Sequence, residues 1–290
     1  MHSVYDFSAG DHAVMLGDQV RLDAYHEAIT HQVKEGMVVA EIGTGTGILS
    51  AFAASKTKGQ ITAIEYYGYS AKIAEDMMKA AKLDQVKVIR AKSFDVILDP
   101  QPDVLITETI GAIGPEENIV ELCYDFKKRH PNIKSIIPSR IRVCAEPIRS
   151  TKLVGWEQNF YDYFASASFG TFDYKAVRPT LENIWCSQVR YDSLSDAETL
   201  GDPIVLAEYV LGETEFSSFS KEIDLSELQT VDAVHLYFEA VLDQDLILST
   251  HYSEPETHWR HGFVSRPTNG NKLTVSFESG AICVTPTWQV

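Results

Sequence analysis

The chain lacks the features that mark disulfide-rich and membrane-spanning proteins. Its 290 residues include only four cysteines, Cys123, Cys144, Cys186 and Cys283, which are widely spaced and form no C-x-x-C pair. Such spacing indicates neither a zinc site nor a disulfide framework. The N-terminus does not resemble a signal peptide, so we expect reduced thiols in the cytoplasm. No apolar run approaches the ~18 residues that a membrane-spanning helix requires. We therefore expect no metal and no membrane span.

Positive charge is also scarce. Lys and Arg number 25 against 41 Asp and Glu, which gives a formal net charge of −16 at pH 7. Proteins that bind nucleic acid present a basic face, and this composition does not supply one. The one dense basic run, at 127–130, precedes a proline and is placed to complement the dipole at the end of a helix. An acidic surface suits a cationic partner and serves simple solubility equally well.

The most informative stretch of the chain runs from residue 41 to residue 50 and reads EIGTGTGILS. A short apolar run of strand length precedes it, and a helical pattern follows it. A glycine-rich turn between a buried strand and a helix lets the backbone approach a nucleotide closely. Gly43, Gly45 and Gly47 are spaced G-x-G-x-G, and Ile48 stands where a dinucleotide fingerprint would have its third glycine. This spacing favours S-adenosylmethionine (SAM) over NAD.

The first half of the chain alternates strand patterns with helix patterns. Such alternation predicts an α/β fold with a doubly wound parallel sheet, whose ligands bind beyond the carboxyl ends of the strands. The strands are expected at 37–42, 60–65, 85–90, 103–108 and 133–137. The helices are expected at 19–34 with Asp18 as its cap, from 48 onward, at 69–82 and at 116–129.

The pattern changes at Pro138, where helical periodicity fades. Short β-type runs punctuated by Gly, Asn, Asp and Pro predict an antiparallel sandwich or barrel. An aromatic segment from Trp156 to Tyr174 interrupts them as a helical excursion, whose apolar face packs on its own core or serves association. We therefore divide the chain into 1–138 and 139–290. The expected strands are 139–146, 183–191, 203–210, 231–242, 245–250, 259–265, 272–278 and 281–286.

Three glutamates stand at or near the ends of predicted parallel strands: Glu41, Glu65 and Glu108. Glu65 lies 22 positions after Gly43, at the end of the second strand. An acid at this place accepts hydrogen bonds from the ribose hydroxyls of a bound nucleoside. The alternative is a solvated acid at a strand end. The glycine turn nearby favours the ligand role.

Glu108 and Glu117 bracket a loop that contains two glycines and a proline. If the loop folds back, the two carboxylates come together and repel each other, which raises the pKa of one of them. A bound guanidinium removes that conflict, because its planar fork of N–H donors matches paired carboxylates. The alternative takes Glu117 as a first-turn helix acid and Glu108 as incidental.

Two further segments are less specific when each is considered alone. Thr257-His258-Trp259 lies in the β half and is suited to line a pocket, although a buried structural histidine is the simpler reading. Arg21 follows Met15 and Asp18 in the segment MLGDQVR, and it is placed to reach a ligand carboxylate or to serve as an ordinary helix residue.

Together these segments resemble the protein arginine N-methyltransferase family. Residues 15–21 match its M-L-x-D-x-x-R pattern, residues 43–49 its SAM turn, and residues 257–259 its T-H-W signature. Glu65 matches its ribose acid, and Glu108 and Glu117 match its double-glutamate loop with the same nine-residue step. The order holds from about residue 5 to residue 265. The family's architecture, a SAM-binding sheet domain followed by a β-barrel with a helical dimerisation arm, implies a homodimer and places the arm at about 155–176.

The resemblance also implies roles for individual residues. Arg21 would pair with the methionyl carboxylate of SAM, and His12 and Met15 would cover the cofactor from a mobile N-terminal helix. Glu108 and Glu117 would clamp a guanidinium, while His258, paired with Asp18, would complete the site and relay the proton. The implied cofactor-binding set is His12, Met15, Arg21, Glu41, Gly43, Gly45, Glu65 and the backbone near Ser93.

The chain also departs from the family pattern. Phe94 stands where an acid often meets the adenine amino group, Ile119 replaces a common methionine, and Asp6 falls near a usual aromatic residue. The leading hypothesis is a SAM-dependent guanidino N-methyltransferase acting on protein or peptide arginine, on free arginine, or on a guanidine-bearing metabolite. The alternatives are a SAM-binding regulatory or scaffold protein without turnover, and a nicotinamide-dependent oxidoreductase, which Ile48 disfavours.

Overall fold

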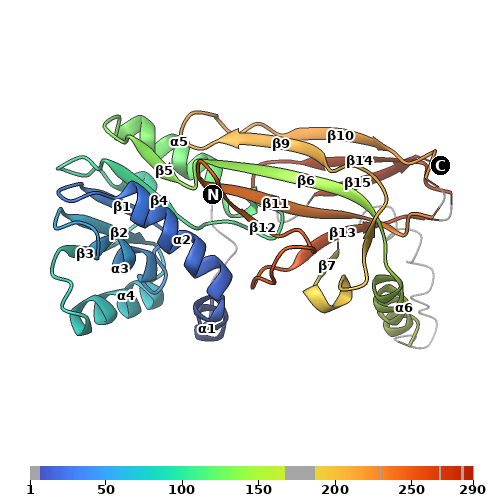
Figure 1. Cartoon of the computed structure of the whole chain (residues 1–290), viewed down its shortest axis with the longest axis horizontal. Coiled ribbons are helices and arrows are strands. Elements are labelled where there is room, and N and C mark those ends of the chain that lie inside the picture. The colour runs from blue at the N-terminus through green and yellow to red at the C-terminus, as the bar shows by residue number, and fades with distance from the viewer. Residues whose placement is uncertain (1–6, 167–186, 229, 268, 282–283, 290) are drawn as a thin grey trace.

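The structure of the chain, a computed structural model, describes residues 7–166, 187–228, 230–267, 269–281 and 284–289. A parallel sheet with its helices lies at one end of the molecule, and long antiparallel strands extend to the other end (Figure 1). None of the helices within these ranges is long and apolar enough to cross a membrane.

The first half forms a five-stranded parallel sheet in the order β3-β2-β1-β4-β5, which confirms the predicted α/β fold. All residues of β1, β2 and β4 are buried, as in strands that are covered on both faces. The strand order reverses between β1 and β4, and ligands bind at such a switch point. Each strand lies within two residues of its predicted range: β1 (Val39–Ile42), β2 (Ile61–Glu65), β3 (Val86–Arg90), β4 (Val104–Thr107) and β5 (Ser135–Ile137).

Five helices accompany this sheet in the described part of the chain. Asp18 caps α2, as predicted, because its Oδ1 accepts the backbone N–H of Arg21 at 2.9 Å. The sequence analysis did not single out α1 from a local pattern, although Ser8 and Asp11 form a capping box at its start. The helices are α1 (Ala9–Gly17), α2 (Gln19–Gln32), α3 (Ile48–Ala54), α4 (Gly68–Ala80) and α5 (Ile119–Arg129), with short 3-10 turns η1 (Ser93–Asp95) and η2 (Pro115–Glu117).

The helix predicted at 116–129 begins later than expected. Pro115 starts the separate turn η2, and Asn118 takes a left-handed conformation with φ 64° between η2 and α5. The first turn of α5 contains Glu121 as its acid. Glu117 is therefore an acid of the 3-10 turn η2 and not of the first turn of α5.

The second half consists of two antiparallel sheets that share one core. Val143 and Leu236 of the larger sheet pack in the same cluster as Leu273 and Phe277 of the smaller one. The larger sheet has the order β7-β13-β11-β6-β8, with β12 on β11 and β9 on β6, and the smaller has the order β10-β14-β15. The strands are β6 (Arg140–Arg149), β7 (Ser187–Val189), β8 (Glu198–Thr199), β9 (Ile204–Val210), β10 (Phe219–Asp224), β11 (Ala233–Asp243), β12 (Leu246–Ser249), β13 (His261–Ser265), β14 (Lys272–Phe277) and β15 (Thr285–Gln289).

The predicted helical excursion begins as α6 (Thr151–Ser166), which lies at the end of the molecule opposite the parallel sheet (Figure 1). Residues 167–176 of the expected arm lie outside the described residues, as do Cys186 and Cys283. Cys123 and Cys144 are buried free thiols. The 3-10 turn η4 (Tyr191–Ser193) follows β7.

A single hydrophobic core joins the two halves of the molecule. Phe238, Leu248 and Trp259 of the antiparallel part pack in the same cluster as Ile42 and Leu105 of the parallel sheet. Helix α2 contacts β11 and β12 as well as α3 and β5. Because the halves share a core, side chains from both can be held in fixed positions around one site.

Candidate functional site

A cavity of about 600 Å³ opens at the carboxyl ends of the parallel strands. Ten of the predicted site residues line it, whereas Asp18 and His258 are outside the lining, with Asp18 bonded to the backbone N–H of Arg21 and to His258. Within the described ranges, no group of His, Cys, Asp and Glu is arranged to hold a metal ion. The predicted lining residues are His12, Met15, Arg21, Glu41, Gly43, Gly45, Glu65, Ser93, Glu108 and Glu117.

The glycine turn forms one wall of the cavity with its backbone. Gly43 and Gly45 have φ values of 71° and 55°, in the left-handed region that side chains disfavour. A Cβ on Gly43 would lie 2.7 Å from Thr109 Cγ2, and one on Gly45 would lie 3.3 Å from His12 Cε1. The turn therefore requires glycine for two reasons, backbone conformation and close approach.

Glu41 lies behind the glycine turn. Its Oε2 accepts hydrogen bonds from Thr44 Oγ1 at 2.7 Å and from the Ser50 hydroxyl. Burial raises the pKa of Glu41 to about 7, and the two hydroxyls oppose that shift. We predicted Glu41 as a cofactor-binding residue, but these bonds indicate that it holds the turn in shape.

Glu65 faces the cavity with both carboxylate oxygens. Its Oε2 accepts the backbone N–H of Gly45 at 3.0 Å, and its Oε1 accepts that of Tyr67 at 2.8 Å. A carboxylate has about four acceptor positions. After these two bonds, each oxygen of Glu65 can still accept a hydroxyl, which is the arrangement that two ribose hydroxyls require.

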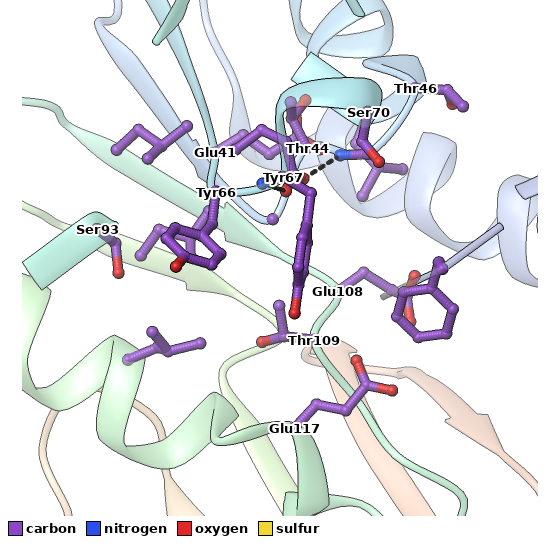
Figure 2. Close-up of a pocket in the computed structure, with 18 of the residues that line it drawn as sticks. Glu41, Thr44, Thr46, Tyr66, Tyr67, Ser70, Ser93, Glu108, Thr109 and Glu117 are labelled. Atoms are coloured by element: carbon purple, nitrogen blue, oxygen red, sulfur yellow. Dashed lines mark hydrogen bonds between the residues drawn. The ribbon is translucent and has the colours of Figure 1, made fainter. Parts of the chain in front are cut away.

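Two tyrosines that the sequence analysis missed follow Glu65 directly. Tyr66 and Tyr67 both line the cavity, and their rings meet edge to face at 5.1 Å. Tyr66 lies on the Ser93 side, while Tyr67 points across the cavity toward Thr109 (Figure 2). An aromatic pair immediately after a strand-end acid was the available signal. These rings give the nucleoside side of the cavity apolar surface for a flat base.

His12 and Ser93 border the same side. His12 Nε2 lies 3.0 Å from Ser70 Oγ, which ties α1 to α4 next to the glycine turn. Burial lowers the pKa of His12. The carbonyl of Ser93 accepts a hydrogen bond from Arg129 Nη2 at 2.8 Å, so Arg129 does more than complement the helix dipole. The Ser93 side chain lies at the cavity edge (Figure 2).

Arg21 and Glu108 form a partly buried ion pair at the other side of the cavity. Arg21 Nη1 donates to Glu108 Oε2 at 2.5 Å, and Nη2 donates to the Met15 carbonyl at 2.8 Å. Burial raises the pKa of Glu108, and the guanidinium of Arg21 opposes that shift. The resemblance implied a ligand carboxylate as the partner of Arg21, whereas here the guanidinium bridges α1 and Glu108.

Glu117 reaches into the cavity from below Thr109, on the side facing Glu108 (Figure 2). Burial raises the pKa of Glu117 well above its usual range, and the carboxylates of Glu108 and Glu116 raise it further. None of the hydrogen bonds or ion pairs found among the described residues involves its carboxylate. Paired buried carboxylates are stable in the ionised form only when a cation lies between them.

The T-H-W segment joins the antiparallel half to both sides of the site. The backbone N–H and Nδ1 of His258 each lie 2.8 Å from Asp18 Oδ2. Burial raises the pKa of Asp18, but the hydrogen bonds from His258 and Arg21 lower it by more, so the pKa lies below its ordinary value. Trp259 Nε1 donates to the Ile110 carbonyl at 2.8 Å, in the loop that follows Glu108.

Glu116, next to Glu117, is buried inside that same loop. Its Oε1 accepts the N–H of Ile113 at 2.9 Å, whereas its Oε2 has no hydrogen-bond partner. A Cβ on Gly111 would lie 2.5 Å from this Oε2, so Gly111 is needed where the loop wraps the carboxyl group. Burial raises the pKa of Glu116 to about 7. The loop is therefore closed around a carboxyl that favours its neutral form.

We expect Glu116→Gln to remove a pH dependence of folding stability. A carboxyl whose pKa rises from 4.5 to about 7 on folding stabilises the fold below 4.5 and loses that contribution as pH rises through about 7. The loss is on the order of 3 kcal/mol at most. Urea unfolding should show that the free energy of unfolding of Glu116→Gln, relative to that of wild type, is higher at pH 8 than at pH 5. Glu213→Gln, at an exposed position, is the matched control, and an equal difference at both pH values would contradict the prediction.

The comparisons with known proteins agree with this geometry. No protein-family profile matches the chain. "Probable protein arginine N-methyltransferase 6.1" of Oryza sativa subsp. japonica is 28% identical over 239 residues, which cover 79% of this chain and 60% of the relative. "Protein arginine N-methyltransferase PRMT10" of the same rice is 33% identical over 140 residues, 47% of this chain and 37% of the relative. The chain thus spans less than two thirds of the length of these two curated relatives.

A solved structure shares the whole fold. The Trypanosoma brucei PRMT1 enzyme-prozyme heterotetrameric complex with AdoHcy superimposes with a TM-score of 0.71 at 20% identity, covering 93% of this chain and 87% of that one. At that identity the superposition establishes the fold alone, and the sequence relatives show a similarity that extends over most of the chain. In sequence and in fold, the chain is similar to the protein arginine N-methyltransferases.

Proposed function

We propose that the protein transfers a methyl group from SAM to a guanidino nitrogen of arginine. The observation that carries this proposal is the pair Glu108 and Glu117, two partly buried carboxylates that line one cavity, where Arg21 is paired with Glu108. No cationic side chain in the described part of the chain pairs with Glu117. A substrate guanidinium supplies five N–H donors in a plane and satisfies both carboxylates at once.

The residues around the cavity fit SAM. Glu65 retains acceptor positions for ribose hydroxyls, and Tyr66 offers a ring for adenine beside Ser93. The left-handed glycines bring bare backbone to the cavity wall. Arg21 is a cation available for a carboxylate, through the donors that do not bind Glu108 and Met15. When bound, SAM supplies an electrophilic methyl group on a sulfonium.

The chain's own residues contribute position and charge. Glu108 and Glu117 hold the guanidinium and draw its positive charge toward the nitrogens they bind, which leaves the remaining nitrogen more nucleophilic. Arginine has a pKa above ~12, so no side chain removes its proton beforehand. His258, held by Asp18, is the proton acceptor we propose for the release that accompanies or follows transfer. Holding both reactants in one cavity supplies the rest of the rate.

Methyl transfer can be tested directly with isotopically labelled SAM. We expect the protein to label an arginine side chain, in a protein lysate or as free arginine, with mass spectrometry locating the methyl group on a guanidino nitrogen. Labelling of the protein lysate alone identifies a protein-modifying enzyme, and labelling of free arginine or agmatine identifies a small-molecule enzyme. Tight SAM binding without any methylated acceptor would favour the regulatory or scaffold alternative. Reduction of NAD in place of transfer would reverse the cofactor assignment.

We further propose that the SAM-binding part comprises residues 1–138 and the substrate part residues 139–290, and that the chain acts as a cytoplasmic homodimer through the segment at about 155–176. The aromatic content of α6 supports association, because Trp156 and Phe160 stack at 5.7 Å and Tyr163 is 77% exposed. Light scattering of the intact chain and of a Tyr163→Glu variant tests the dimer, and an unchanged monomer mass in both would contradict it.

A further inference from the structure

A second cluster of titratable side chains lies in the antiparallel half, outside the lining of the cavity. It centres on Glu146 of β6 and includes His235 of β11, His251 after β12, and His261 of β13. The side chains of Glu146 and His235 have no exposed surface, and that of His251 is 18% exposed. Buried groups of this kind are costly unless each is hydrogen-bonded.

Glu146 meets that requirement through several bonds. Its Oε1 accepts from His235 Nδ1 at 3.0 Å and lies 2.7 Å from His251 Nε2, while Thr199 Oγ1 donates to its Oε2 at 3.2 Å. Burial raises the pKa of Glu146, but the hydrogen bonds from the two histidines outweigh burial and lower the pKa to about 2. Glu146 is therefore a carboxylate at neutral pH. It binds His235, which lies on β11, and His251, which lies after β12.

The chain after β12 fixes which nitrogen of His251 carries the proton. The backbone N–H of Ser253 donates to His251 Nδ1 at 3.1 Å, so we assign Nδ1 as the acceptor. The hydrogen of the neutral ring then resides on Nε2 and points to Glu146. In this tautomer His251 donates to Glu146 through Nε2 and accepts from the backbone of Ser253 through Nδ1, so it connects Glu146 to the segment that starts at residue 251.

That segment, residues 251–259, ends at the site. It contains turns and irregular structure but no strand. At its far end His258 binds Asp18, and Trp259 binds the Ile110 carbonyl. Near its start, His251 binds Glu146, and Tyr252 pairs with Thr199 at 2.5 Å between hydroxyl oxygens. The same short segment is thus anchored in the barrel at one end and presents His258 at the other.

We propose that Glu146 is a positioning residue for His258, acting through His251. By holding His251, Glu146 fixes the start of segment 251–259 and so the approach of His258 to Asp18 and of Trp259 to Ile110. The effect of Glu146 on kcat rests on the proposed function, whereas its effect on the position of His258 does not. The described histidines and acids form no metal-binding group, so a metal does not account for the cluster.

The test compares five variants. His251→Ala removes the link at a partly exposed position, and we expect about a tenfold fall in kcat with the Kd for SAM within twofold of wild type. Glu146→Ala should match it, and the double variant should be no worse than either single, because both act through one contact. Glu146→Gln should keep kcat within about threefold, since its amide oxygen accepts from both histidines and its NH2 faces Thr199. Ile148→Val, also buried on β6, is the control for destabilisation alone.

A second readout does not depend on turnover. The imidazole 15N resonances of His258 report its bond to Asp18, and they should shift in His251→Ala and Glu146→Ala but not in Glu146→Gln or Ile148→Val. Wild-type kcat together with an unshifted His258 signal in His251→Ala would overturn the proposal and leave the cluster as a stabilising element of the barrel. A shifted His258 signal in a protein that methylates no guanidine would support the positioning role and reject the proposed function.

Discussion

Replacing Glu117 with glutamine is expected to lower kcat for methyl transfer by about 10²–10³-fold. The substitution keeps the size of the side chain and removes the charge that would hold the guanidinium. Because no cation among the described residues pairs with Glu117, its loss should leave the cofactor side undisturbed. The Kd for SAM, measured by calorimetry, is therefore expected to stay within about threefold of wild type.

The comparison with Glu108 sharpens this experiment. Glu108→Gln should abolish turnover, but it also removes the ion-pair partner of Arg21 and is expected to alter cofactor affinity at the same time. Glu75→Gln, the same change at an exposed position of α4, should match wild type in both measurements. If Glu117→Gln turned over at the wild-type rate, the paired-carboxylate account of the site would be wrong, whatever the Kd for SAM.

Replacing Glu65 with alanine is expected to weaken SAM binding by at least about 100-fold. Hydrogen bonds to a charged acceptor contribute about 1.5–3 kcal/mol each, and Glu65 is placed to accept two ribose hydroxyls. The variant also removes the acceptor for the N–H groups of Gly45 and Tyr67, which loosens the turn. Titration of SAM by calorimetry gives the affinity, and circular dichroism shows whether the fold persists.

Two comparisons separate lost contacts from lost structure. Glu65→Gln retains an acceptor oxygen and should lose less affinity than Glu65→Ala. Glu75→Ala, at an exposed position of α4, should bind SAM as wild type does. A folded Glu65→Ala that binds SAM with unchanged affinity would remove Glu65 from the ribose site and reopen the choice of ligand.

Local sequence patterns were enough to predict the strands of the parallel sheet. The strands are short apolar runs bounded by Gly, Pro and acids, and burial on both faces leaves that pattern clear. β10 was missed because only Ile223 in it is buried, so its charged residues show no apolar period. The start of α5 was misplaced because the pattern alone does not reveal the left-handed Asn118 that separates η2 from the helix. Tyr66 and Tyr67 were missed because aromatic side chains near a strand end fit a core as well as a ligand site.

The sequence by itself determined the glycine turn, the acids at the strand ends and the order of the family's motifs, because each depends on neighbouring residues or on fixed spacing. The tertiary structure alone decided which distant side chains meet. Three contacts depend on how the elements pack on one another. They are the bond between Asp18 and His258, which are 240 positions apart, the pairing of Arg21 with Glu108, and the link from Glu146 to His251. Local propensity does not encode such contacts, since they arise only when the sheets and helices are docked.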